Sequence, residues 1–170
     1  MSYGCSVSRG PAANFLELGM GIERASMILQ AAGAMVPGSA SADDLSALLD
    51  MIDGQALYRS RYLVMAFIAP VFDMVLLDPA QPRSLAFQLE QVVRQLGELP
   101  LLKADGMPEA PLRLARQLRA RVEANDAGAI STDLIADLRR DLSALSDSIA
   151  RRFFLQEEGP MASDGASLLA

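Results

Sequence analysis

The sequence predicts an all-α protein, folded as an antiparallel bundle of about six helices. Hydrophobic residues make up 51% of the 170 residues, and Leu, Ala and Met dominate them, whereas aromatic residues are only 5% and Trp is absent. This composition favours helices over sheets. Apolar residues also recur at intervals of three and four along most of the chain. We expect a single helical bundle domain over residues 1–157 and a flexible tail over residues 158–170.

Helix-start and helix-stop signals place the elements in the first third of the chain. Pro11 suits the first turn of a helix that runs to about Gly33, which is a natural C-terminal cap. Ser41 then stands three residues before Asp44, an approximate capping box that opens a second helix. Gly54 weakens this second helix by about 1 kcal/mol, and we expect the helix to continue through it to residue 62.

The remaining helices follow from proline positions and apolar stripes. Pro70 opens a short helix to Leu77, and Asp78 before Pro79 ends it. A fourth helix begins near Pro82, a loop is expected over residues 100–111, and a fifth helix spans residues 112–124. Ser131 caps the last helix, whose stripe is the strongest periodic signal: Ile135, Leu138, Leu142, Leu145, Ile149 and Phe153.

Composition excludes several classes of function. The 15 basic and 21 acidic residues give a net charge of −6, which disfavours binding to nucleic acid or to anionic lipid. The absence of histidine excludes His-based catalysis and the commonest zinc ligand. We therefore predict no metal and no cofactor. The longest apolar run, residues 62–72, is too short to span a membrane, and the single Cys5 fits a reducing cytoplasm.

The Glu23–Arg24 pair lies in the middle of a helix that is apolar on most sides. Helical geometry places Glu23 on one face with Leu16, Met20 and Met27. We interpret this face as buried, where an unpaired carboxylate would be costly, and predict a cationic partner for Glu23. The candidate polar network draws on three segments: Glu23, Arg24, Tyr58, Arg59, Arg61, Asp78, Arg83 and Ser84.

Two interpretations of this candidate network stay open at this point. In the first, it is a structural set of ion pairs that joins three helices, with Asp78 balancing Arg24 or Arg83. In the second, Arg24 and the arginines at 59, 61 and 83 converge into a pocket for a carboxylate or phosphate. Gly19 and Gly21 would let another backbone or a ligand approach the first helix closely. No residue is predicted to be catalytic.

Several blocks of the sequence resemble one known family. Residues 8–11 (SRGP), 15–19 (FLELG) and 22–25 (IERA) are similar to the alpha-E domain family, which is named for its helices and its Glu-Arg motif. Further blocks follow in order at residues 58–62 (YRSRY), 76–79 (LLDP), 82–89 (PRSLAFQL), 144–147 (ALSD) and 151–154 (RRFF). The resemblance therefore covers nearly the whole chain.

The resemblance implies a function that the residues alone leave open. It implies a bacterial, noncatalytic helical accessory or interaction domain that works beside a circularly permuted ATP-grasp ligase of the amide type, an ATP-dependent carboxylate–amine ligase. The alternative is a small-molecule or peptide binding domain that uses the arginines around the Glu-Arg motif. The chain is similar to the C-terminal half of the family domain, so an apolar surface left uncovered by the first half could drive formation of a homodimer.

Overall fold

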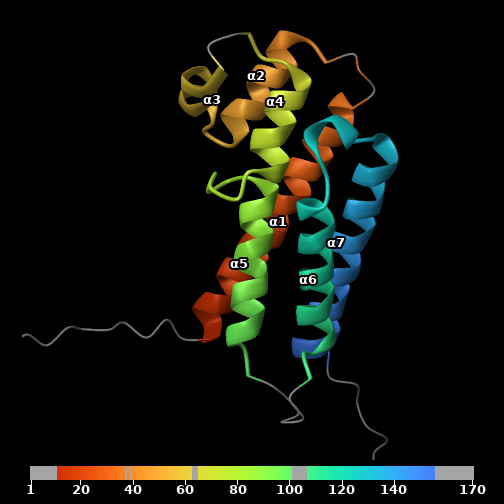
Figure 1. Ribbon diagram of the computed structural model, residues 1–170. Coiled ribbons are helices and arrows are strands. Elements are labelled where there is room, and N and C mark those ends of the chain that lie inside the picture. The colour runs from red at the N-terminus through yellow and green to blue at the C-terminus, as the bar shows by residue number, and fades with distance from the viewer. Residues whose placement is uncertain (1–10, 37, 39, 63–64, 101–106, 156–170) are drawn as a thin grey trace, which may run out of the picture.

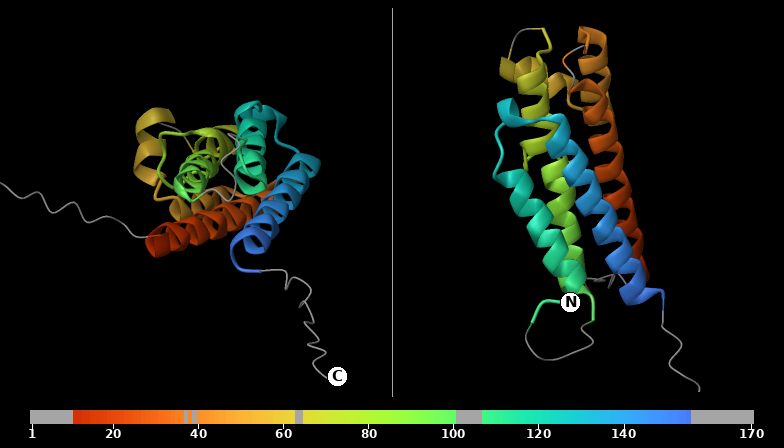
Figure 2. Two further views of the ribbon diagram at one scale, coloured as in Figure 1. Left: turned by 90° about the horizontal axis from the view of Figure 1, so that it is seen from below. Right: turned by 90° about the vertical axis from the view of Figure 1, so that its right-hand side faces the viewer.

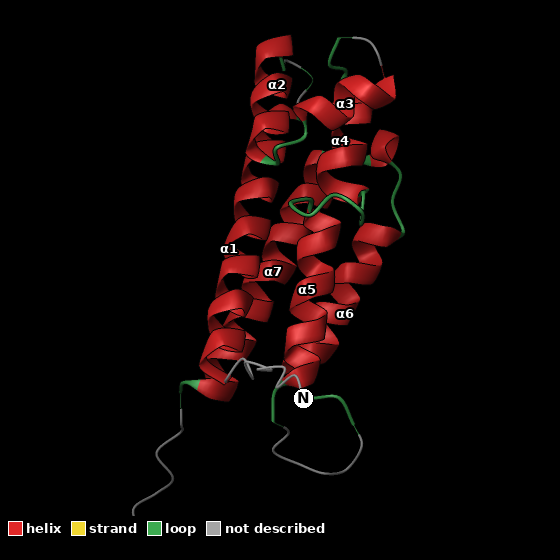
Figure 3. Ribbon diagram, turned by 90° about the vertical axis from the view of Figure 1, so that its left-hand side faces the viewer, coloured by secondary structure: helices red, strands yellow, loops and turns green. Residues whose placement is uncertain are grey.

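The computed structural model describes residues 11–36, 38, 40–62, 65–100 and 107–155. Within these residues there are seven α-helices and no strand, so the predicted all-α class is confirmed (Figure 3). The expected tail over residues 158–170 and residues 101–106 of the expected loop at 100–111 lie outside the described residues. The α-helices are α1 (Pro11–Met35), α2 (Ala42–Met51), α3 (Gln55–Tyr62), α4 (Ile68–Phe72), α5 (Leu85–Glu98), α6 (Ala110–Glu123) and α7 (Thr132–Phe153).

Four of the helices form an antiparallel bundle. Helix α1 packs against α5, α5 against α6, α6 against α7, and α7 back against α1. The four run alternately up and down, and α1 extends along the whole molecule, while α2, α3 and α4 cover one end (Figure 1). Seen from below, α1 and α7 lie side by side along one side of the bundle (Figure 2).

The core is made of the apolar stripes that the sequence predicts. On α7, every stripe residue from Ile135 to Ile149 is buried, and Phe153 packs at the edge of the core. On α5, Leu85, Leu89, Val92 and Leu96 are buried as well. These helices therefore turn one apolar face inward and a charged face outward, as the three-and-four periodicity indicates.

The predicted single helix from Ser41 to residue 62 is wrong. The capping box is present, since the Ser41 hydroxyl accepts from the Asp44 amide at 3.1 Å, but α2 ends at Met51 and α3 starts at Gln55. Between them, Asp53 has a φ of 53°, in the left-handed region that commonly terminates a helix. Gly54 is buried, and a methyl group added there would lie 2.9 Å from Ile52 Cδ1. A side chain at residue 54 would therefore force the Ile52 side chain to shift, and glycine avoids this contact.

The third predicted helix has different bounds and a different geometry. Helix α4 begins at Ile68, before Pro70, and continues as a π-helical turn, η1, over Asp73–Leu77. Asp78 adopts an extended conformation before Pro79 and ends the element as predicted. The next helix starts at Leu85 with Ser84 as its N-cap, three residues later than Pro82. A short 3-10 turn, η2 (Ala127–Ala129), precedes α7.

The two glycines of α1 occupy different surroundings. A methyl group at Gly21 would lie 3.2 Å from Val92 Cγ2, so Gly21 allows α5 to approach α1 closely. A methyl group at Gly19 would meet no atom within 4 Å among the described residues.

We therefore expect Gly19→Ala to raise the free energy of unfolding by about 1 kcal/mol, because alanine restricts the unfolded chain and favours the helix. Gly21→Ala should gain less, because Val92 must shift to admit the methyl group. Urea unfolding of both variants measures this difference. A destabilised Gly19→Ala variant would show that another group covers Gly19.

Candidate functional site

Glu23 and Arg24 lie on the outside of the bundle. Both side chains are exposed, and neither forms an ion pair with any other described residue. The prediction that Glu23 is buried is therefore wrong. The residues on the same face of α1 as Glu23 are exposed as well: Leu16 is 66% exposed, Met27 52% and Met20 40%. The reason is that α1 turns its opposite side to α5 and the core.

The predicted arginine partners of Glu23 lie elsewhere. Arg61 Nη1 pairs with Asp78 Oδ2 at 2.6 Å, and Arg83 Nη1 pairs with Asp53 Oδ2 at 2.6 Å. Arg59 is exposed on α3, which packs against α2. Asp78 therefore balances Arg61, in place of the predicted Arg24 or Arg83. In the described structure, these arginines do not converge with Arg24 around Glu23.

Part of the candidate network does come together at the junction of α3, η1 and α5. The Ser84 hydroxyl donates to the Asp78 carbonyl oxygen at 2.6 Å and accepts from the Phe87 amide at 3.0 Å. Asp78 Oδ1 accepts from the Ala80 amide at 2.8 Å. The hydrogen bond to Asp78 raises the pKa of Arg61. These groups satisfy one another and hold the turn between η1 and α5 in place.

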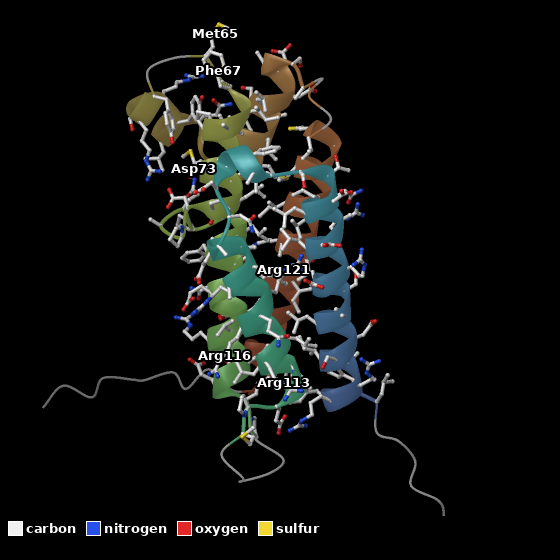
Figure 4. All side chains as sticks on the ribbon, turned by 45° about the vertical axis from the view of Figure 1, so that its right-hand side comes forward. Met65, Phe67, Asp73, Arg113, Arg116 and Arg121 are labelled. Atoms are coloured by element: carbon white, nitrogen blue, oxygen red, sulfur yellow. The ribbon has the colours of Figure 1, made fainter. Side chains whose placement is uncertain are left out.

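Tyr58 positions the segment that leads into α4. Its ring is buried, and its hydroxyl donates to the Met65 carbonyl oxygen at 3.2 Å and accepts from the Phe67 amide at 3.1 Å. The side chains of Met65 and Phe67 project at the end of the molecule (Figure 4). Beside Tyr58, burial raises the pKa of Tyr62, whose hydroxyl lies 3.5 Å from Asp73 Oδ2. Tyr58 thus acts as a structural residue.

We expect Arg83→Ala to change the free energy of unfolding by about 0.5 kcal/mol or less, because both partners of the Arg83–Asp53 pair are more than half exposed. Thermal unfolding at moderate salt measures the change. A loss of several kcal/mol would mean that Arg83 belongs to a buried network after all.

Helix α6 carries four arginines, and two of them form ion pairs with the neighbouring helices (Figure 4): Arg113, Arg116, Arg119 and Arg121. Arg119 pairs with Glu90 of α5 at 2.6 Å. Arg121 pairs with Asp137 at 3.2 Å and also with Asp141, both on α7. These arginines therefore connect α6 to its two neighbours, while Arg113 and Arg116 stay exposed.

A groove of about 500 Å³ runs between α1 and α7, beside the exposed face of α1. Phe15 stacks edge-on with Phe153 and Phe154, at 5.1 and 5.5 Å between ring centroids. The lining contains one charged residue, Glu23, together with apolar and small side chains: Phe15, Leu18, Gly19, Ile22, Ser26, Met27, Ser146, Ile149, Ala150 and Phe154. Sequence reasoning missed the α7 side of this groove, because no local pattern places α7 beside α1.

Within residues 11–155 as described, no group of three or more Cys, Asp or Glu side chains could hold a metal ion. Among the described helices, none combines the length and the hydropathy that crossing a bilayer requires.

By its structure, this protein is an all-helical bundle with an exposed Glu-Arg pair in the middle of its first helix. The model of the Alpha-E family, described as a predicted alpha-helical domain with a conserved ER motif, matches residues 4–154. The chain belongs to this family. Its one Glu-Arg dipeptide is Glu23–Arg24, which places the motif on the outer side of α1. No curated protein and no solved structure matches the chain.

Proposed function

We propose that the protein is a noncatalytic accessory domain that docks beside an ATP-grasp amide ligase through the outer face of α1. The observation that carries this proposal is the exposure of Leu16, Met20 and Met27 next to an apolar groove. Large apolar side chains gathered on one exposed face are typical of an interaction surface. The choice of an ATP-grasp ligase as the partner comes from the resemblance described above.

The assignment as an accessory domain agrees with the chemistry of the exposed face. The sequence contains no histidine, and neither Ser26 nor Ser146 forms a hydrogen bond with Glu23, the one carboxylate and so the one candidate base in the groove lining. A nucleophile needs such a base to be activated. The chain would therefore supply binding surface, and the ligase would supply the reaction. We place the complex in the bacterial cytoplasm, where the single Cys5 would stay reduced.

Copurification tests this function. The chain is expressed together with the ATP-grasp protein of the same genome, and Met20→Lys/Met27→Lys is compared with wild type. We expect the wild-type chain to copurify with the ligase and the double variant to lose it at an unchanged melting temperature, because both side chains are already exposed. A ligase whose assembly and activity ignore the whole chain would refute the proposal.

The same face gives two competing arrangements. A homodimer could cover it, which light scattering over a range of concentrations detects. A small molecule or peptide could instead occupy the groove, whose volume of about 500 Å³ falls within the usual range of ligand pockets. Its lining would suit an apolar cation better than the anion predicted from the arginines, because Glu23 is its one charged residue.

A further inference from the structure

Helix α1 carries two apolar stripes on opposite sides. One stripe faces the core and is buried throughout: Leu18, Gly21, Ala25, Ile28 and Ala32. The other, which we call the outer seam, is exposed throughout and is mostly apolar, with Glu23 and Gln30 as its polar members: Leu16, Met20, Glu23, Met27, Gln30 and Ala34. A helix that is apolar on both sides is typical of one that is packed between two layers. The described residues supply one of these layers.

The spacing of the outer seam indicates that the second layer packed on α1 would be a helix. Its positions follow one another at intervals of four, three, four, three and four, which is the seven-residue repeat of helices that pack side by side. The seam is about 27 Å long at 1.5 Å per residue. The small residues Gly19, Ser26 and Ala150 line the adjoining groove and would let a helix backbone approach closely.

The charge on this surface identifies what the incoming helix carries. Glu23 is the one charged residue in the outer seam and in the groove lining. An apolar helix laid along the seam would remove water from this carboxylate without replacing its hydrogen bonds, which is costly. A second copy paired seam to seam would bring another carboxylate, since Arg24 lies about 100° round the helix from Glu23.

From these observations we infer that the outer seam binds an amphipathic helix of a partner protein, with apolar residues in a seven-residue repeat and a Lys or Arg facing Glu23. A charged residue at one seam position would fix the register and orientation of the pair. This inference rests on the proposed docking function only in treating the outer face of α1 as an interface. It does not require the partner to be a ligase.

A pair of synthetic peptides tests the inference on the whole chain. Each is a labelled amphipathic helix of about five turns, matched to the seam length, and the two differ only in a central seam residue, Lys or Glu. We expect fluorescence anisotropy to show that wild type prefers the Lys peptide by about tenfold. Glu23→Lys should reverse this preference. Glu123→Lys is the matched control, because it makes the same change on α6, the helix across the bundle from α1, and should leave the preference unchanged.

A second variant separates binding from folding. Gly19→Leu adds a side chain in open space on the groove side of α1, so it should keep the melting temperature and weaken both peptides by tenfold or more. Equal binding of the two peptides, or a preference that Glu23→Lys leaves unchanged, would overturn the inference. A dimer in light scattering that Gly19→Leu dissociates would also overturn it and assign the seam to a second copy. Failed copurification with the ligase, beside a positive peptide result, would refute the ligase partner alone.

Discussion

Leu89→Ala is expected to lower the free energy of unfolding by about 3 kcal/mol, because it removes three carbon atoms from a fully buried site and leaves a cavity. Leu89 lies at the middle of α5, which packs against α1, α6 and η1. The structure around such a cavity relaxes only partially, so most of the space stays empty. For a chain of this size we expect a fall in melting temperature of about 6–12 °C.

Leu16→Ala is the matched control for this prediction. The chemical change is the same, but Leu16 is already largely exposed on the outer seam, so the loss should stay below about 0.5 kcal/mol. Urea unfolding of both variants measures the two values. A Leu16→Ala loss as large as that of Leu89→Ala would show that the outer seam is covered in the isolated chain, and the assignment of its two faces would fail.

Arg152→Met is expected to lower the free energy of unfolding by about 2 kcal/mol, between the values typical of exposed and of fully buried ion pairs. Arg152 donates hydrogen bonds to both carboxylate oxygens of Glu109, from Nε to Oε2 and from Nη2 to Oε1 at 3.1 Å. Its Nη2 also donates to the Pro100 carbonyl oxygen at 3.2 Å. Both side chains of the pair are more than four-fifths buried. The contact ties the end of α7 to the residues just before α6 and just after α5.

Arg151→Met tests whether this effect belongs to the pair. Arg151 is the exposed neighbour of Arg152 in the last turn of α7, so its loss should be small. A double-mutant cycle with Glu109→Gln should show a coupling energy of at least 1 kcal/mol. Equal losses for the two arginine variants would mean that the Arg152–Glu109 pair adds nothing to stability.

The sequence was sufficient for the parts of the fold that local patterns determine. The stripe of α7 has one apolar face and one charged face, so only one packing direction is available. The capping box of Ser41 and Asp44 lies within four residues and needs no tertiary information. The break near Gly54 could not be predicted, because it depends on the left-handed conformation of Asp53 and on the crowding of Gly54 by Ile52.

The site was harder to predict because α1 is apolar on both sides. Periodicity shows that Glu23 shares a face with Leu16, Met20 and Met27, but it cannot show which of two apolar faces meets the core. The contact between α1 and α5 decides this, through the close approach at Gly21 and Val92. Once Glu23 is placed outside, the nearby arginines no longer need to reach it. Arg61 instead pairs with Asp78, and Arg83 pairs with Asp53.

Methionine oxidation footprinting tests the central claim most directly, because peroxide oxidises exposed thioethers and spares buried ones. Two other methionines serve as internal controls for the oxidation: Met65 is exposed at the far end of the molecule, and Met74 is buried. We predict that Met20, Met27 and Met65 oxidise in the isolated chain, and that the Lys peptide protects Met20 and Met27 while Met65 stays reactive. If Met20 and Met27 resist oxidation in the isolated chain as Met74 does, or oxidise equally fast with the peptide bound, the outer face of α1 is not a docking surface.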